Sequence, residues 1–353
     1  MRSFFKDLKV IELAGVLAGP AAGTFFAELG ARVIKVENKR ACGDVTRGWF
    51  VEGEEQTEPS AYYSSVNYGK DIFMADFTDD TDLNRLLEEL EDADIVISNY
   101  LPRVAKKFGL DYESLKSRFP KLIYLELKGY SDSDRPAFDV VLQAETGWIS
   151  MTGTDRDHPA KLPVALIDVL AGHQLKEAAL LALLHRERTG EGSHVTCTLE
   201  EASLSALANQ ASNYLMAGKV AQPIGTAHPN IAPYGDWFET EDGVRFVLAV
   251  GSQKQFENLL EILNLSDFAA EYTSNSVRVE KRERLVRQLQ SAINRQPFEE
   301  LSKKLNEGNV PFGEIKSLDR VLESKTARAM TLEETIEGKA TKKLSGIAFK
   351  NSF

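Results

Sequence analysis

The chain has 353 residues, of which 43% are hydrophobic and 27% charged, so it contains enough apolar residues for the cores of two domains. Its formal net charge of −11 argues against a nucleic acid as partner. The only two cysteines, Cys42 and Cys197, predict neither a disulfide framework nor a metal site, and no apolar run reaches the roughly 18 residues of a membrane span.

The first half of the chain alternates predicted strands with predicted helices. Residues 8–13 (LKVIEL) indicate a buried strand, a glycine-containing loop and a helix follow, and residues 31–38 (ARVIKVEN) indicate the next strand. After a long polar region at 39–70, strands are expected at 72–77, 94–100 and 122–131, and helices at 79–93 and 101–120. Such repeated βα units predict an α/β fold with a parallel, doubly wound sheet.

The loop after the first strand contains Gly15, Gly19 and Gly23 at a spacing of four. This spacing differs from the GxGxxG fingerprint, which argues against a dinucleotide-dependent dehydrogenase. A loop at a helix N-terminus can still receive a phosphate or a carbonyl group. Close packing of the helix on the sheet explains the glycines equally well.

Asp168 is a lone acid at the end of an apolar run and directly before an Ala/Leu-rich helix. That helix is expected to end at Gly190 and Gly192, and the alternating HVTCT then indicates a strand. Aspartate is among the best N-cap residues, so Asp168 is predicted to cap the helix. The helix dipole would also keep the carboxylate ionised, and an ionised carboxylate in a dry cleft can act as a nucleophile. The two roles are compatible.

The rest of the chain predicts a second, smaller domain. An apolar helix is expected at 139–151, a long helix at 200–218 and an ordered linker at 219–237, followed by a hairpin and several helices. We place a large domain at 1–199, completed by 311–353. The helix and linker occupy 200–224, and a small α+β domain occupies 225–310.

Seven stretches resemble, in the same order, the family III CoA-transferases, which include formyl-CoA transferase and the carnitine CoA-transferases and are related to the α-methylacyl-CoA racemases. The matching stretches are 8–38, 93–116, 122–130, 162–172 (LPVALIDVLAG), 182–195, 228–250 and 309–315. The resemblance implies a large Rossmann-like domain, a smaller domain between its parts, and an interlocked homodimer. A cytoplasmic location is expected, because the first residues do not predict a signal peptide and two isolated cysteines suit a reducing compartment.

The resemblance also implies that Asp168 is the catalytic nucleophile. It would attack an acyl-CoA to form a mixed anhydride, and CoA would then form an aspartyl-CoA thioester before passing to a carboxylic acid. The expected partners are therefore an acyl-CoA and a carboxylic acid. No permanently bound cofactor and no metal are expected. Backbone N–H groups around Gly15–Gly19 are candidates for stabilising the oxyanion.

Further residues are predicted by the same resemblance to bind CoA or substrate at the carboxyl edges of successive strands, where open α/β sheets bind ligands. They are Val16, Leu17, Ala18, Asn38, Lys39, Arg40, Ala75, Asp76, Phe77, Asn99, Tyr100, Leu101, Lys107, Arg135, Phe138 and Asp139. Asn38 replaces an expected cation, which Lys39 or Arg40 can supply. Asp139 is expected either to shape the pocket or to cap the helix that it begins.

Several departures from the family pattern bear on the substrate. Leu17 stands where some members carry Gln, and the small domain lacks the Gly-rich loop of formyl-CoA transferase, which together argue against formyl-CoA/oxalate exchange. Phe138 stands where the racemases have a histidine, and a phenyl ring cannot accept a proton. A CoA-transferase is therefore favoured over a 2-methylacyl-CoA racemase or a non-catalytic acyl-CoA-binding protein.

The acyl pocket is predicted to be apolar and larger than formate requires. Its proposed lining residues are Leu17, Trp49, Phe138 and Trp148. Arg47 or His228 is proposed to hold a second carboxylate, should the substrate be a dicarboxylic acid.

Overall fold

The computed structural model describes residues 3–57 and 59–350, and these form two compact units. The first comprises the described residues up to 148, residues 161–220 and those from 325 onward, whereas the second comprises 149–160 and 221–324. These limits differ from the predicted domains. The chain returns to the first unit at 325 rather than 311, because β9 (Phe312–Glu314) pairs with β8 (Arg245–Ala249) of the second unit.

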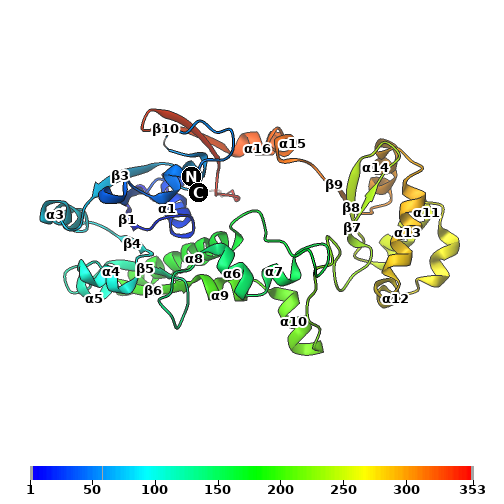
Figure 1. The fold of residues 1–353 in the computed structure, drawn as a ribbon, viewed down its shortest axis with the longest axis horizontal. Helices are drawn as coiled ribbons and strands as arrows, with labels where there is room; N and C mark the ends of the chain where they lie inside the picture. The colour runs from blue at the N-terminus through cyan, green and yellow to red at the C-terminus, as the bar shows by residue number, and fades with distance from the viewer. Residues whose placement is uncertain (1–2, 58, 351–353) are drawn as a thin grey trace. The chain divides into compact units, whose positions relative to one another are not determined.

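A six-stranded sheet forms the centre of the first unit. Its order is β3-β2-β1-β4-β5-β6, and all neighbouring strands are parallel, as predicted (Figure 1). The strands are β1 (Lys9–Leu13), β2 (Arg32–Asn38), β3 (Lys70–Ala75), β4 (Ile95–Ser98), β5 (Ile123–Lys128) and β6 (Ser193–Thr198). The order reverses between β1 and β4, and ligands of such sheets bind outside the carboxyl ends of the strands at this switch point.

Helices cover both faces of this sheet, because alternate side chains of each buried strand point to opposite faces. Val10 of β1 packs in the apolar cluster that includes α1 (Ala18–Glu28) and α8 (Leu166–Thr189). Ile11 packs in the opposite cluster with α3 (Asp80–Glu89). The remaining elements of this unit are η1 (Lys39–Ala41), η2 (Val45–Gly48), α2 (Ala61–Ser64), α4 (Pro102–Lys107), α5 (Tyr112–Leu115), α6 (Asp139–Glu145), α9 (Leu199–Ser205), α10 (Ala208–Ala217), α16 (Lys325–Met330), β10 (Thr331–Ile336) and β11 (Lys339–Leu344).

Three helices predicted as continuous are divided. Residues 101–120 form α4 and α5, separated by Gly109 in the left-handed region at φ 66°. The predicted helix at 139–151 is divided at Gly147, with φ 90°, into α6 and α7 (Trp148–Met151). The predicted helix at 200–218 breaks into α9 and α10, where Ala208 has φ 44°. Hydrophobic spacing continues through each break, so it did not reveal them.

The second unit contains a three-stranded antiparallel sheet in the order β7-β8-β9, in which β7 is Tyr234–Glu239. The predicted hairpin is therefore present. Its core gathers apolar side chains such as Phe238, Phe246 and Leu289. The helices are α11 (Gln253–Ile262), η3 (Ser266–Glu271), α12 (Asn275–Glu280), α13 (Arg282–Ile293), α14 (Phe298–Glu307) and α15 (Leu318–Leu322). None of the described helices has the length and apolar character needed to span a membrane.

Candidate active site

Asp168 lies in the first turn of α8, and only 7% of its surface is exposed. The N-cap residue is Ala165, so the prediction that Asp168 caps the helix is wrong. Asp139 of α6 caps α8 instead, because its Oδ2 accepts a 2.7 Å hydrogen bond from the Ile167 N–H. Within residues 3–57 and 59–350, no hydrogen bond or ion pair engages the Asp168 carboxyl group.

The surroundings of Asp168 disfavour its charge. Burial raises the pKa of Asp168 to about 7, and the negative charge of Asp139 adds to the increase. Burial and the charge of Asp139 thus oppose the helix dipole, which was expected to keep this carboxylate ionised. A carboxylate that is poorly solvated and uncompensated by a cation is more nucleophilic once it is ionised.

Asp139 supports the segment that leads into α8. Its Oδ1 accepts a hydrogen bond from Gln143 Nε2, and Gln143 Oε1 accepts a 2.9 Å bond from the Leu162 N–H. The carboxylate thus fixes both the approach to α8 and the first turn that carries Asp168. Of the two roles expected for Asp139, capping is observed, but the capped helix is α8 rather than the helix that Asp139 begins.

The loop between β1 and α1 lies beside the first turns of α8. A β-carbon at Gly172 of α8 would be 3.1 Å from the carbonyl oxygen of Ala18 in α1, so α1 and α8 pack closely there. Asp168 precedes Gly172 by one turn and shares its face of α8. It therefore lies toward the start of α1, which places the predicted loop residues Val16, Leu17 and Ala18 on the side of the carboxylate.

Two of the predicted oxyanion donors are already engaged. The Gly15 N–H donates to Asn99 Oδ1 at 3.2 Å, and the Val16 N–H donates to Asp44 Oδ2 at 3.2 Å. These two N–H groups cannot serve a ligand in this conformation. In the described part of the chain, α1 begins at Ala18, and its N-cap residue Leu17 makes no side-chain cap, so the N–H groups of Leu17, Ala18 and Gly19 are the candidates that remain.

The predicted CoA-binding residues follow the carboxyl ends of β2, β3 and β4. Asn38 Oδ1 accepts a 2.9 Å bond from the Arg40 N–H, Lys39 lies 3.7 Å from Asp82, and Arg40 lies 3.9 Å from Asp76. The ion pairs join the end of β2 to the residues after β3, and Asn38 pairs with Ala75 in the β2–β3 register. Both cations are half-exposed or more and remain accessible to a phosphate.

Aromatic rings continue this edge toward β4. The ring of Phe77 lies 6.3 Å from that of Tyr100 and 5.5 Å from that of Phe108. The Lys107 ammonium lies 5.0 Å from the centre of the Phe108 ring. The structure thus brings these predicted residues together, while their binding of CoA stays a prediction.

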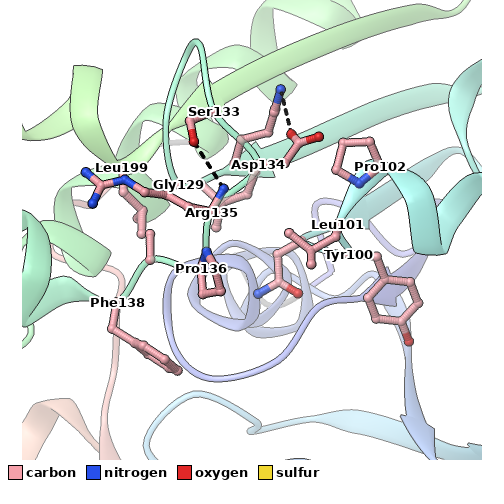
Figure 2. A pocket seen from close by; sticks show the side chains of 14 residues that line it. Tyr100, Leu101, Pro102, Gly129, Ser133, Asp134, Arg135, Pro136, Phe138 and Leu199 are labelled. Atoms are coloured by element: carbon pink, nitrogen blue, oxygen red, sulfur yellow. Dashed lines mark hydrogen bonds and ion pairs between the residues drawn. The ribbon is translucent and has the colours of Figure 1, made fainter.

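A pocket of about 200 Å³ opens beside these residues, at the ends of β4 and β5 (Figure 2). It is lined by Asn99, Tyr100, Leu101, Pro102, Leu127, Lys128, Gly129, Ser133, Asp134, Arg135, Pro136, Ala137, Phe138 and Leu199. Arg135 is ion-paired with Glu145, and its guanidinium lies 3.9 Å from the centre of the Tyr130 ring. Of the predicted ligand residues, Asn99, Tyr100, Leu101, Arg135 and Phe138 share this pocket.

The prediction that Arg47 holds a substrate carboxylate is wrong. Arg47 is buried, with its Nε 2.6 Å from Glu37 Oε2 and its Nη1 2.9 Å from Glu337 Oε2, so it cannot hold a substrate carboxylate. Trp148 donates its indole N–H to Ser203 Oγ at 2.9 Å and packs, half-buried, against the apolar core, and its place in an acyl pocket stays a prediction. His228 belongs to the second unit.

Tyr62 is a site residue that the sequence did not reveal. Burial raises the pKa of its phenol to about 12, and the charges of Asp168 and Asp139 add to the increase, so these groups are near one another. Trp49 packs edge-to-face on Tyr62 with 5.1 Å between ring centres. Tyr62 lies on α2, inside a region that was predicted as a polar loop, and no local pattern marks it.

Among the described residues, no group of three histidine, cysteine, aspartate or glutamate side chains is placed to hold a metal ion. The arrangement instead combines a buried carboxylate, a helix N-terminus and a cationic, aromatic edge of the sheet. Such a combination suits acyl transfer from a phosphorylated carrier.

Comparison with known proteins agrees with this chemistry. The model of CoA-transferase family III matches residues 5–353. The chain is 35% identical over 350 residues to the succinate–glutarate CoA-transferase of Agrobacterium fabrum, covering 96% of this chain and 87% of that protein. It is 34% identical over 329 residues to the succinyl-CoA:glutarate CoA-transferase of Homo sapiens, covering 90% and 72%. It is also 33% identical over 293 residues to the succinyl-CoA:mesaconate CoA-transferase of Haloarcula hispanica, covering 80% and 73%.

A solved structure shares the whole architecture. The CAIB/BAIF family protein from Brucella suis superimposes with a TM-score of 0.83 at 34% sequence identity, covering 99% of this chain and 94% of that one. The predicted α/β fold is thus confirmed.

Proposed function

The chain belongs to CoA-transferase family III, and we propose that it moves CoA from succinyl-CoA to a second dicarboxylic acid through covalent intermediates on Asp168. The observation that carries the proposal is the buried Asp168 carboxyl group in the first turn of α8, which has no cation partner in the part of the chain that the structure describes. The choice of dicarboxylates is supported by relatives named for succinate, glutarate and mesaconate.

The proposed reaction begins with attack of the ionised Asp168 on the thioester carbonyl carbon. The carbon–sulfur bond breaks, CoA leaves as a thiolate, and a mixed anhydride joins Asp168 to the donor acid. The thiolate then attacks the aspartyl carbonyl carbon, so the donor carboxylate leaves and an aspartyl-CoA thioester remains. Attack by the acceptor carboxylate reverses both steps and releases the acceptor as its CoA thioester.

Each tetrahedral intermediate places negative charge on a former carbonyl oxygen. The N–H groups of Leu17, Ala18 and Gly19 at the start of α1 are proposed to stabilise that oxygen. The phosphates of CoA are proposed to bind Lys39, Arg40, Lys107 and Arg135 along the sheet edge, with Phe77 and Tyr100 beside the adenine. Phe138 offers no proton acceptor, so racemase chemistry is not proposed.

We further propose that the protein is a homodimer. Large apolar side chains on α8 and α10 support this, because Leu181, Leu215 and Met216 are 69%, 79% and 89% exposed in the single chain. Light scattering coupled to size-exclusion chromatography tests it, and a monomer mass at micromolar concentration would contradict it. The cytoplasmic location stays a prediction.

The central test is to trap the intermediate. The protein is incubated with succinyl-CoA, the aspartyl anhydride or aspartyl-CoA thioester is captured with hydroxylamine or borohydride, and intact mass and peptide mapping locate the change. We expect a modified Asp168 in the wild type and in Asp139→Asn, which retains the nucleophile, but an unmodified protein in Asp168→Asn. CoA transfer without modification of Asp168 would contradict the mechanism. Transfer only from acetyl-CoA would contradict the proposed donor.

A further inference from the structure

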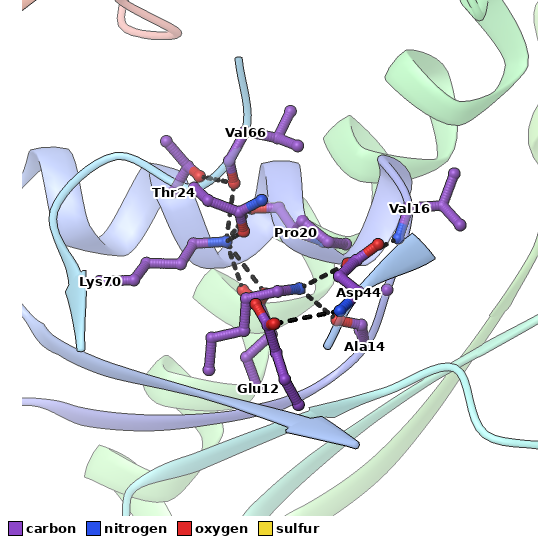
Figure 3. A network of polar contacts seen from close by, with 12 residues as sticks. Glu12, Ala14, Val16, Pro20, Thr24, Asp44, Val66 and Lys70 are labelled. Carbon is purple, nitrogen blue, oxygen red and sulfur yellow. Dashed lines mark hydrogen bonds and ion pairs between the residues drawn. The ribbon is translucent and has the colours of Figure 1, made fainter. Parts of the chain in front are cut away.

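Side chains bind four polar backbone groups around Gly15, at the turn between β1 and α1. The Ala14 carbonyl accepts a 2.8 Å bond from Lys35 Nζ, and the Val16 N–H donates to Asp44 Oδ2 at 3.2 Å (Figure 3). Between them, the N–H and carbonyl of Gly15 form bonds of 3.2 and 3.0 Å with the amide of Asn99. The turn is thus held from both sides, by β2 and the residues after it, and by the end of β4.

Lys35 and Asp44 also bind each other, at 2.9 Å, and both side chains are buried. Lys35 lies 3.2 Å from Glu12 Oε1, and Lys70 lies 2.7 Å from Glu12 Oε2, so two lysines and two carboxylates form one buried network (Figure 3). The network extends into α1, because Lys70 Nζ also donates to the Pro20 carbonyl at 2.9 Å.

Gly23 provides the space for this network under α1. A β-carbon there would lie 1.8 Å from Glu12 Oε2, so a side chain at this position would displace the Glu12 carboxylate from its contacts with Lys35 and Lys70. The buried Glu12 carboxylate therefore explains the glycine at position 23. Packing of helix on sheet, the explanation drawn from the sequence, applies to Gly19, where a β-carbon would lie 2.5 Å from that of Ala14.

Stability alone does not account for such a network. Buried ion pairs pay a large desolvation penalty, and well-packed apolar residues often serve folding as well or better. Val16 in addition adopts φ 71°, a conformation that costs a non-glycine residue about 1 kcal/mol or more and persists only where the surroundings impose it. What the network provides is one defined conformation of the turn.

That conformation determines where the first N–H groups of α1 point. They follow Val16 directly, and the Ala18 carbonyl lies against Gly172, one turn beyond Asp168 on the same face of α8. A shift of about 1 Å in such donors is enough to cost roughly 100-fold in rate. A small displacement of this turn would therefore move the N–H groups relative to the reacting atoms.

We propose that Lys35 and Asp44 are positioning residues, which hold the Ala14 carbonyl and the Val16 N–H and thereby aim the N–H groups of Leu17, Ala18 and Gly19 at the thioester oxygen attacked by Asp168. This inference rests on the proposed function. Neither side chain contacts the substrate, so the pair acts through the backbone of the turn.

The test compares Asp44→Ala and Asp44→Asn with Glu28→Gln. Glu28 is an equally buried carboxylate at the far end of α1, paired with Lys343, and serves as the matched control. In Asp44→Ala we expect kcat to fall about 100-fold while KM for succinyl-CoA changes less than about threefold. Asp44→Asn, which retains an acceptor for the Val16 N–H, should recover part of that loss, and Glu28→Gln should lower the melting temperature with kcat unchanged.

Hydrogen–deuterium exchange of the peptide covering residues 14–19 provides a readout that does not depend on activity. The positioning role requires faster exchange of the Val16 amide in Asp44→Ala, with β1 and the later turns of α1 still protected. Unchanged exchange, or a kcat that falls no further than in Glu28→Gln, would overturn it. A wild-type protein without CoA transfer would instead contradict the proposed function, and the exchange result would still decide whether Asp44 holds the turn.

Discussion

Asp168 and Asp44 are both buried carboxylates of the first unit, and they differ in their surroundings. Asp44 accepts hydrogen bonds from Lys35, Val16 and Thr46, and these contacts outweigh its burial and hold its pKa below the usual range. Asp168 has burial and a neighbouring carboxylate, which raise its pKa to about 7. The same side chain is thus a fixed structural charge in one place and a group of adjustable charge in the other.

The difference shows how one unit can hold both a scaffold and a reactive group. A carboxylate that is paired with a cation and hydrogen-bond donors, as Asp44 is, gains nothing by reacting, because its lone pairs are already engaged. An uncompensated one is destabilised as an anion and gains from forming a covalent bond. The network around Glu12, Lys35 and Lys70 fixes the turn at Gly15, while Asp168 faces that turn from α8.

The largest effect is expected from removing the reactive member of this comparison. Asp168→Asn replaces the nucleophile by a neutral amide of the same size, and we expect kcat for CoA transfer to fall by about 10⁴-fold or more. A coupled assay of succinyl-CoA consumption measures it. Asp44→Asn should lose less than about 100-fold. Equal losses in the two variants would remove the distinction between reactive and structural carboxylates.

The next effect concerns the compensated network. Lys70→Met leaves Glu12 with Lys35 as its remaining buried cation, and we expect the free energy of unfolding to drop by about 3–5 kcal/mol in urea titrations. The double variant Glu12→Leu/Lys70→Met should recover much of that loss, because no unpaired charge remains. Lys303→Ala, which breaks an exposed pair with Glu299, should leave the urea midpoint unchanged. If the urea midpoint of Lys70→Met equalled that of Lys303→Ala, the stability of the network would not depend on pairing each buried charge with an opposite one.

The scaffold was predictable from the sequence because its signals are local. Each parallel strand is a short apolar run bounded by polar residues, as at 94–100 and 122–131, and such runs are typical of buried strands. Asp168 was predicted by its place in a family motif. The breaks at Gly147 and Ala208 were missed, since apolar spacing continues across them.

The electrostatics were not predictable, because they depend on partners far apart in the chain. Arg47 was expected to be free for substrate, yet its partner Glu337 is 290 residues away. The cap of α8 comes from Asp139 on another helix, which leaves Asp168 without the hydrogen bonds of a capping residue. No periodicity or spacing in the sequence records these pairings, so the sign of the pKa shift at Asp168 required the fold.

The pH dependence of catalysis tests the reactive carboxylate directly. Transfer requires ionised Asp168, so we expect kcat/KM to rise about tenfold per pH unit below pH 7 and to level off above it. Asp139→Asn removes the neighbouring negative charge and should move the midpoint to lower pH. If kcat/KM were already constant from pH 5 upward, partners would stabilise the negative charge of Asp168 in the working enzyme, as they do for Asp44.

The smallest expected effect is that of Asp168→Asn on stability. This substitution should raise stability, although it lowers activity. Because the pKa of Asp168 is higher in the folded than in the unfolded chain, its ionisation opposes folding fully above about pH 7 and not at all below about pH 4. Asp168→Asn should therefore stabilise the protein at pH 8, with the gain fading as the pH falls toward 4. Thermal unfolding at pH 5 and pH 8 measures the difference. A variant less stable than the wild type at pH 8 would show that the Asp168 charge is compensated in the folded chain, and the contrast with Asp44 would then be lost.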